Sequence, residues 1–337
     1  DLKGRDKLNT KEAILKKLAE NKGKFISGEF LRQELNISRT AVWKHMLKLR
    51  EDGYPIEAIS NRGYRLKDFQ DIYDKSAIIS QLNTKTLGKK LFFLNEIDST
   101  NNELKRLSAE GAEEGTTVVA LKQLAGRGRR GRSWCSEDGK GIFMSVLLKP
   151  DIAPEEAQAI TLAVSSAACK VIDSYTNVKP GIKWPNDILL QGKKVCGILT
   201  ELSAEPDMIN SIILGIGINV YGKKNDFPEE LREIATSLSE HTDIELSRSK
   251  IVANVLEEIE NLYLDFLEKR STARFLNIWR CYSVTLGRDI IIHQGENAWQ
   301  AKALDVLGNG HLLVETASGE RQAISSGEIS IRDGYGK

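Results

Sequence analysis

Three short helical patterns followed by two strand-like segments occupy the first 67 residues, and this order constrains the fold more than any other feature of the sequence. A residue suited to helix capping stands at the start of each helical pattern: Thr10, Ser27 and Ser38. The third pattern, RTAVWKHMLKLRED, places Val42, Met46 and Leu49 on one stripe. The segments YPIEAIS and GYRL flank the turn Asn61-Arg62-Gly63. The sequence therefore predicts a winged helix-turn-helix domain over residues 1–67.

The charge of this segment favours a DNA-binding role. Residues 1–67 contain 16 Lys and Arg against 9 Asp and Glu, a net charge of +7, whereas the remainder contains 32 against 38, a net charge of −6. In a winged helix the start of the third helix faces the major groove and the hairpin tip reaches phosphate or the minor groove. The predicted DNA contacts are Ser38, Arg39, Thr40, Lys44 and Arg62. A small helical interaction domain without nucleic acid is the alternative.

Several classes of protein are excluded by the rest of the composition. The 337 residues predict two or three domains at about 150 residues each. No window approaches the ~18 consecutive apolar residues of a membrane span, and the charged start is unlike a signal peptide. The four cysteines contain no CxxC, and the four histidines have no HExxH or paired ligand spacing. We expect a cytoplasmic protein with no membrane segment, disulfide framework or bound metal site.

The segment Lys122–Arg132, KQLAGRGRRGR, contains five basic residues and three glycines after the strand-like Thr117–Ala120. It includes the spacing G-x-G-x-x-G, but a dinucleotide site requires a helix directly after that motif, and Ser133–Ser136 lacks helical periodicity. The P-loop pattern is also absent. A mobile loop of backbone N–H groups and guanidinium groups could instead surround several anionic oxygens. A solvated surface loop and a second DNA contact are the alternatives.

Three further segments carry polar residues at the ends of apolar strands. KWPND is predicted to end one strand and Gln191–Lys194 to form a hairpin turn, so Lys183 and Lys194 are expected on neighbouring strands. Ile212–Asn219 is predicted as a buried strand whose glycines permit close backbone approach. Asn95–Asn102 is expected to leave a strand and cap the helix ELKRLSAE. Ordinary strand lysines, a core strand and an ordinary helix cap remain alternatives for each segment alone.

Together these segments resemble one family, the bifunctional biotin protein ligases that also repress the biotin operon (BirA type). The resemblance covers almost the whole chain, through IDSTN (97–101), QLAGRGRRGRSW (123–134), W-x-S-x-x-G-x-G (134–141), KWPND (183–187), KKVCGIL (193–199) and GIGIN (215–219). It implies a central α/β ligase domain of the biotin/lipoate ligase type with a mixed sheet over residues 75–270. It also implies a small SH3-like β-barrel over residues 282–333, where strand patterns alternate with glycine-containing turns. The fold class is therefore multidomain α+β.

The same resemblance assigns site residues by motif position. Biotin binding falls to Ser99, Thr100, Asn101, Gln123, Arg127, Gly128, Arg129 and Lys194, with the first three holding the ureido ring and the loop closing over the carboxylate. Adenylate or ATP binding falls to Arg127, Arg129, Arg132, Trp134, Lys183 and Asn219. The residues that meet the reacting groups are Arg129, Lys183 and Lys194.

The resemblance also implies the reaction and the partners. Biotin and ATP with Mg²⁺ would form biotinyl-5′-AMP, and biotin would pass to a lysine of a biotin carboxyl carrier protein. The adenylate would serve as corepressor for a homodimer on operator DNA. Two alternatives stay open: a biotin-sensing repressor without catalysis, and a lipoate-type acyl ligase with an unrelated N-terminal domain.

Overall fold

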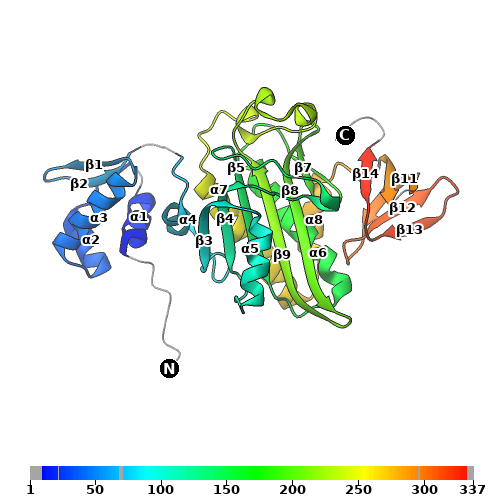
Figure 1. Ribbon diagram of the computed structural model, residues 1–337, viewed down its shortest axis with the longest axis horizontal. Coiled ribbons are helices and arrows are strands. Elements are labelled where there is room, and N and C mark those ends of the chain that lie inside the picture. The colour runs from blue at the N-terminus through cyan, green and yellow to red at the C-terminus, as the bar shows by residue number, and fades with distance from the viewer. Residues whose placement is uncertain (1–9, 22, 68–70, 295–296, 332–337) are drawn as a thin grey trace. The chain divides into compact units, whose positions relative to one another are not determined.

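The computed structural model describes residues 10–21, 23–67, 71–294 and 297–331 (Figure 1). The chain divides into two compact units, residues 1–83 with 245–254 and residues 84–244 with 255–337. Helix α7 (Arg248–Lys269) begins in the first unit and continues in the second. In the described residues no helix is long and apolar enough to cross a membrane.

The first unit confirms the predicted winged helix-turn-helix. Its elements are α1 (Thr10–Glu20), α2 (Gly28–Leu35), α3 (Arg39–Glu51), β1 (Ile56–Ile59), β2 (Gly63–Leu66) and α4 (Lys75–Gln81). Ser27 Oγ accepts a hydrogen bond from Phe30 N at 3.0 Å, and Ser38 Oγ accepts one from Ala41 N at 3.1 Å. Both serines therefore cap their helices as expected. Buried side chains of the three helices and the hairpin form one core: Ile14, Leu15, Leu18, Leu31, Val42, Met46, Leu49 and Ile56.

The hairpin of β1 and β2 depends on one glycine. The two strands pair antiparallel from Ile56↔Leu66 to Ile59↔Gly63. Gly63 has φ of +99°, and a Cβ there would lie 2.1 Å from Ile26 O. A side chain would therefore be both strained and obstructed. Glycine brings the turn directly against the segment that precedes α2.

The second unit contains a seven-stranded mixed sheet in the order β3-β4-β5-β9-β8-β7-β6. Its strands are β3 (Leu91–Ile97), β4 (Thr117–Gln123), β5 (Gly141–Leu148), β6 (Gly181–Lys183), β7 (Asp187–Leu190), β8 (Lys193–Glu205) and β9 (Met208–Asn219). Only β3 and β4 pair in parallel. The expectation that Lys183 and Lys194 occupy neighbouring strands is wrong. Lys183 lies on β6 and Lys194 on β8, because the short strand β7 pairs with both.

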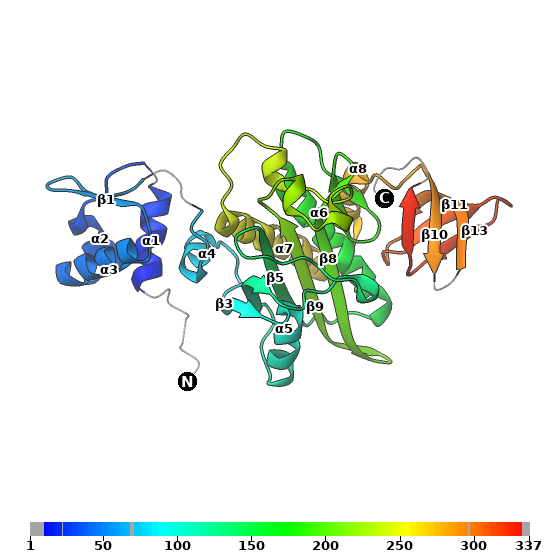
Figure 2. The same ribbon diagram turned by 45° about the horizontal axis from the view of Figure 1, so that its top comes forward.

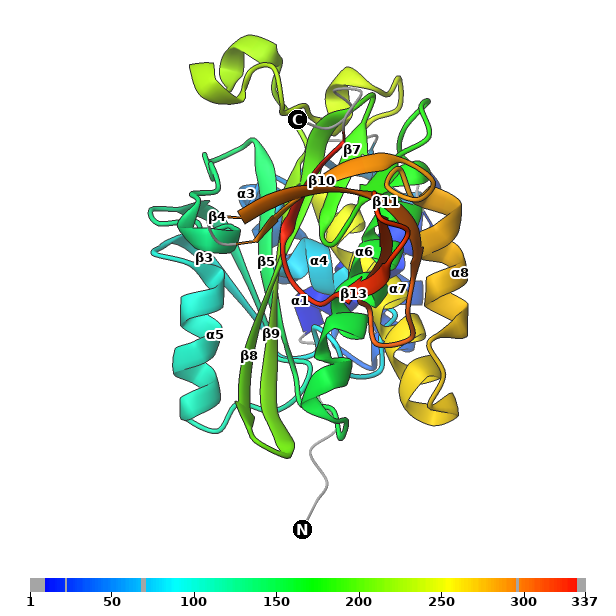
Figure 3. The same ribbon diagram turned by 90° about the vertical axis from the view of Figure 1, so that its right-hand side faces the viewer.

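Helices cover both faces of this sheet, as Figure 3 shows for α5 (Thr100–Ala109) against α7 and α8 (Ala273–Tyr282). Leu104 of α5 packs in a cluster with Ile213 of β9. On α6 (Ala157–Asp173), Thr161 Oγ1 lies 2.7 Å from Thr200 Oγ1. Ile213 pairs with Glu201 and Thr200 pairs with Leu214, so the two contacts are on opposite faces. The α5 face therefore holds Glu201, and the α6 face is apolar core.

The C-terminal part of the second unit is a five-stranded antiparallel sheet (Figure 2) in the order β13-β12-β11-β10-β14. Its strands are β10 (Asp289–Gln294), β11 (Asn297–Val306), β12 (Leu312–Thr316), β13 (Arg321–Ile324) and β14 (Glu328–Ile331). Strands β10 to β13 lie where the sequence patterns DIIIH, WQAKALDV, HLLVET and QAI predict strands. The sequence pattern did not identify β14, which pairs with β10. The closed SH3-like barrel and the domain limits 75–270 and 282–333 stay predictions.

Candidate active site

A cavity of about 680 Å³ opens over the α5 face of the sheet, where β8 and β9 carry glycines instead of side chains. A Cβ on Gly215 would lie 2.3 Å from Asn101 Oδ1, and a Cβ on Gly217 would lie 2.5 Å from the Trp134 ring. Contacts this short cannot persist, so a side chain at position 215 would displace Asn101 and one at position 217 would displace Trp134. The cavity volume suits a small-molecule ligand. Gly215 thus leaves room for the Asn101 side chain, and Gly217 leaves room for the Trp134 ring, in different parts of the cavity lining.

One end of the cavity is a hydrogen-bonded cluster at the N-terminus of α5. Gln123 Oε1 accepts hydrogen bonds from Thr100 N at 2.9 Å and Thr100 Oγ1 at 3.1 Å. Ser145 Oγ lies 2.5 Å from Asn101 Oδ1 and 2.7 Å from Thr100 Oγ1. The helix begins at Thr100, three residues before the predicted ELKRLSAE, and Ser99 makes no side-chain cap bond, which corrects that expectation. Its buried hydroxyl lines the cavity instead.

Cations gather farther along the cavity, around the short strand β7. Lys194 Nζ forms an ion pair with Asp187 Oδ1 at 2.7 Å. Lys183 pairs with Asp187 across the strands and is only 9% exposed. Burial lowers the pKa of Lys183, and the charge of Asp187 acts in the opposite direction. Arg129 Nη1 donates to Asn186 Oδ1 at 3.2 Å, and burial lowers the pKa of its guanidinium. Lys183, Lys194 and Arg129 therefore surround the Asp187 carboxylate in this part of the cavity.

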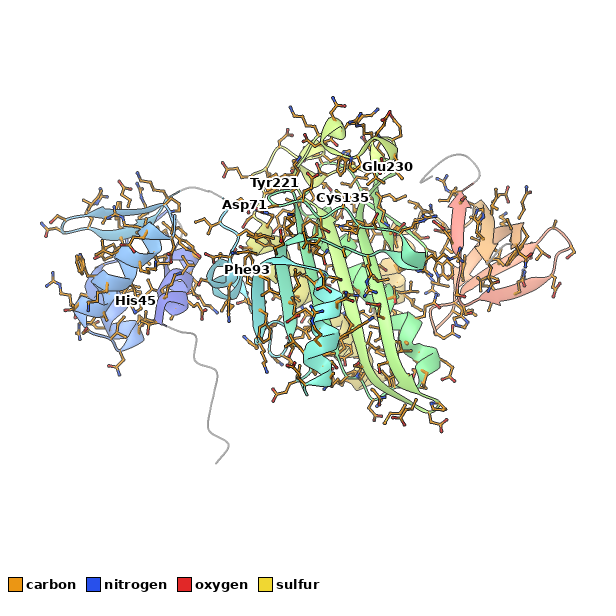
Figure 4. The ribbon with its side chains drawn as sticks, in the orientation of Figure 1. His45, Asp71, Phe93, Cys135, Tyr221 and Glu230 are labelled. Atoms are coloured by element: carbon orange, nitrogen blue, oxygen red, sulfur yellow. The ribbon has the colours of Figure 1, made fainter. Side chains whose placement is uncertain are left out.

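The aromatic residue of this site is Trp134, which lies over the glycines of β8 and β9. Lys194 Nζ is 5.3 Å from its ring centroid. The buried Trp134 Nε1 has no hydrogen-bond partner among the described residues. Asn219, at the end of β9, donates from Nδ2 to Thr236 O at 3.0 Å. Figure 4 places Cys135 and Tyr221 at this same end of the sheet.

The arginine-rich loop is fixed at its start and held by partners along its length. Leu124 N donates to Ile97 O, and Ala125 N donates to Asp98 O, both at 2.8 Å. A single 3₁₀ turn covers Arg129–Gly131, in place of the helix that a dinucleotide site needs. Arg132 forms a two-point ion pair with Glu328 of β14 at 2.6 and 2.8 Å. Thus the predicted nucleotide-binding Arg132 is paired with the C-terminal sheet.

The cavity brings together all of the predicted biotin and adenylate residues, which come from segments far apart in the sequence. It also includes residues that the sequence pattern did not suggest: His293 and Glu328, on the C-terminal sheet. Glu201, which contacts the lining residues Asn101 and Arg127, was also not suggested by the sequence pattern. The sequence contained a weak signal for Glu201. It lies four residues after Gly197 on the same strand, so the two residues face the same side of the sheet. No group of three or more metal-ligating side chains occurs in the described ranges.

The predicted DNA contacts all lie on the surface of the first unit. Ser38, Arg39, Thr40 and Lys44 are exposed at the start of α3. Arg62, at the hairpin tip, stacks with its guanidinium 4.8 Å from the Phe25 ring centroid. A basic, exposed helix start beside a basic hairpin tip is the arrangement that a winged helix presents to duplex DNA.

Three parts of the chain match models of known protein families. The model of the "Biotin/lipoate A/B protein ligase family" matches residues 93–219, an "HTH domain" model matches 10–65, and "Biotin protein ligase C terminal domain" matches 285–332. The biotin protein ligase from Aquifex aeolicus, solved in complex with biotin and ATP, has a TM-score of 0.61 and 34% identity. That match covers 72% of this chain and 99% of the Aquifex chain. The fold and the cavity thus define a biotin/lipoate-type ligase joined to a helix-turn-helix domain.

Relatives that match most of the chain identify its family within this class of ligases. The bifunctional ligase/repressor BirA of Bacillus subtilis (strain 168) is 40% identical over 302 residues, which is 90% of this chain and 93% of that protein. The bifunctional ligase/repressor BirA of Escherichia coli (strain K12) is 30% identical over 310 residues, with 92% and 94% coverage. The chain belongs to the BirA family of bifunctional ligase/repressors.

Proposed function

We propose that this chain activates biotin with ATP to biotinyl-5′-AMP, transfers biotin to a lysine of a biotin carboxyl carrier protein, and represses transcription when the adenylate is bound. The observation that carries the proposal is the division of one cavity. The neutral side chains of Thr100, Asn101 and Gln123 line one end. The basic side chains of Lys183, Lys194 and Arg129 lie farther along. Biotin has the same division, with a neutral ureido ring and an anionic carboxylate.

The first reaction joins two anions, which explains the cations. A carboxylate oxygen of biotin attacks the α-phosphorus of ATP, the bond to pyrophosphate breaks, and biotinyl-5′-AMP forms. Lys183, Lys194 and Arg129 hold both anions within reach and stabilise the charge of the transition state. ATP enters as its magnesium complex, because Mg²⁺ binds mainly through phosphate oxygens and water. Trp134 packs beside the adenine, and Asn219 lies near the adenylate.

The second reaction releases AMP. The neutral amine of the carrier lysine attacks the biotinyl carbonyl carbon, the bond to AMP breaks, and the nitrogen loses a proton. Because water would hydrolyse the mixed anhydride, the intermediate must be protected until the carrier arrives. The loop that carries Arg127, Gly128 and Arg129 provides this protection by ordering over the adenylate.

Regulation uses the same intermediate. A homodimer offers two recognition helices to a palindromic operator and roughly adds their binding free energies, so a ligand that favours dimerisation favours repression. We assign biotinyl-5′-AMP as that corepressor, and Ser38, Arg39, Thr40, Lys44 and Arg62 as DNA contacts. The free cysteines agree with the reducing cytoplasm in which we place the protein.

One assay tests the enzymatic part. The intact chain is incubated with Mg·ATP, a biotin carboxyl carrier domain, and radiolabelled biotin or lipoate. We expect label on the carrier with biotin and none with lipoate. Label from lipoate would identify a lipoate-type ligase. Biotin binding without adenylate formation would identify a sensor that has lost catalysis, and either result would overturn the proposal.

A further inference from the structure

Glu201 of β8 lies at a junction between the predicted ureido-binding residues and the arginine-rich loop. Asn101 Nδ2 donates to Glu201 Oε2 at 2.7 Å, and Lys105 Nζ donates to Oε1 at 2.7 Å. Arg127 Nη2 is 3.3 Å from both carboxylate oxygens. The carboxylate is 21% exposed, so its partners are only partly screened by solvent. One side chain thus contacts both a recognition residue and the loop.

The contact with Asn101 determines the orientation of a buried amide. A carboxylate can only accept hydrogen bonds, so the NH₂ group of Asn101 must face Glu201. The amide oxygen Oδ1 is then directed at Ser145 Oγ, 2.5 Å away, over the space that Gly215 leaves. Asn101 is 3% exposed, so its contacts with Glu201 and Ser145 determine the orientation of the amide. Without the Glu201 carboxylate, the Asn101 amide could rotate by 180° and exchange the positions of Nδ2 and Oδ1, because the Ser145 hydroxyl can both donate and accept a hydrogen bond.

The contact with Arg127 holds the beginning of the loop. Arg127 also donates from Nη2 to Asn102 Oδ1 at 2.5 Å, and Asn102 itself donates to Asp98 Oδ2 at 2.8 Å. The loop residues just before Arg127 are already bonded to the end of β3. Burial favours the protonated form of Glu201, but the hydrogen bonds from Lys105 and Asn101 outweigh it and lower the pKa of the carboxyl. Glu201 is therefore anionic at neutral pH and attracts the first arginine of the loop.

We propose that Glu201 is a positioning residue that couples recognition of the biotin ring to ordering of the loop, by fixing the Asn101 amide and tethering Arg127. The inference rests on the proposed function, because it needs biotin in the cavity. Ligand binding against a fixed amide avoids the entropic cost of orienting it, and a tethered Arg127 reduces the cost of closing the loop. A purely structural role would require only the ion pair between Glu201 and Lys105.

The test compares Glu201→Gln with Lys105→Met, which removes that exposed ion pair but leaves Asn101 and Arg127 in contact with Glu201. Glutamine keeps the size of the side chain but loses its charge. We expect the KM for biotin to rise at least about tenfold in Glu201→Gln, the equivalent of one charge-assisted hydrogen bond, with the KM for ATP nearly unchanged. Preformed biotinyl-5′-AMP should also dissociate faster. Lys105→Met should change both quantities less than about twofold.

A double-mutant cycle distinguishes an effect of Glu201 that acts through Arg127 from a general loss of structure. If Glu201 acts on the loop through Arg127, then Glu201→Gln should accelerate adenylate release by a smaller factor in the Arg127→Ala background than in the wild type, because only the route through Asn101 is then left to lose. Multiplicative effects would overturn the tether, and equal effects of Glu201→Gln and Lys105→Met would overturn the positioning role. Melting temperatures of all variants show whether each is folded. A wild-type chain that forms no biotinyl-5′-AMP would refute the proposed function itself, whereas active Glu201→Gln with wild-type constants refutes only this inference.

Discussion

Lys194 is the residue whose chemical role is easiest to isolate, because it sits between Asp187 and Trp134 and its sequence neighbour provides a control. Lys194→Ala should lower the single-turnover rate of adenylate formation by roughly 10²-fold or more, as for loss of one preorganised group that stabilises transition-state charge. Biotin affinity should change much less. Adjacent strand residues point to opposite faces, so Lys193→Ala should behave like the wild type. Weaker biotin binding with an unchanged rate would contradict this role.

Lys183 leads to a prediction about pH. Burial lowers the pKa of this lysine in the folded, ligand-free chain, so it loses its positive charge below the ordinary lysine value of about 10.4. The quantity kcat/KM for biotin reports ionisations of the free enzyme. Its alkaline decline should therefore begin below pH ~10.4. Lys183→Arg, which keeps a charge at higher pH, should move the decline upward. If the alkaline decline of kcat/KM for biotin is unchanged in Lys183→Arg, the group that causes the decline is not Lys183.

For single residues, the sequence indicated which side chains line the cavity, but it did not indicate which residues those side chains contact. Gln123, Trp134 and Asn219 line the cavity as their motifs predicted. The ion pair of Arg132 with Glu328 spans 196 positions, and no local pattern contains such a contact. Glu201 was missed for a related reason. Its function depends on two donors brought by α5 and by the loop, which only the folded sheet places beside it.

Strands β8 and β9 supply an element-scale prediction, because glycines two positions apart on β9 face different parts of the cavity. A Cβ at position 215 would displace Asn101, whereas a Cβ at position 217 would displace Trp134. Gly215→Ala should therefore raise mainly the KM for biotin, by roughly two- to tenfold for one neutral hydrogen bond, and Gly217→Ala mainly the KM for ATP, by about tenfold for one lost base-stacking contact.

Ile218 provides the matched control for these two variants, since its side chain is on the opposite face of β9 and it is not among the residues that line the cavity. Ile218→Val should cost about 0.5–1.5 kcal/mol of unfolding free energy and leave both KM values unchanged. Equal changes in the two KM values for Gly215→Ala and Gly217→Ala would mean that the cavity does not separate the two substrates.

The elements themselves were largely predictable, and their order in the sheet was not. Capping serines and apolar stripes determined α2 and α3, because those signals are local. The position of β7 between β6 and β8 was misjudged for the opposite reason. A four-residue strand such as β7, Asp187–Leu190, carries too little periodicity to be distinguished from a turn. That error placed Lys183 and Lys194 on adjacent strands, although Asp187 lies between them.

At the scale of the whole molecule, one chain combines a basic winged helix with a cavity in which we propose that biotin and ATP react. Ordering a loop that contains four arginines removes an entropic cost from any surface that the loop helps to build. Formation of the adenylate should therefore be linked to dimerisation and to DNA binding. By linkage, operator DNA should in turn tighten adenylate binding by the same factor.

The measurement that tests this account most directly is a titration of the intact chain with a palindromic duplex, chosen from random sequence in the presence of biotinyl-5′-AMP. Affinity is compared with no ligand, with biotin, and with the adenylate, at one fixed salt concentration because phosphate contacts depend strongly on salt. A chain lacking residues 1–67 serves as the control and should not bind the duplex. We predict the tightest binding with the adenylate and weaker binding with biotin alone. Equal affinity in all three conditions would contradict the account, because the chain would then be a ligase with a constitutive DNA-binding domain.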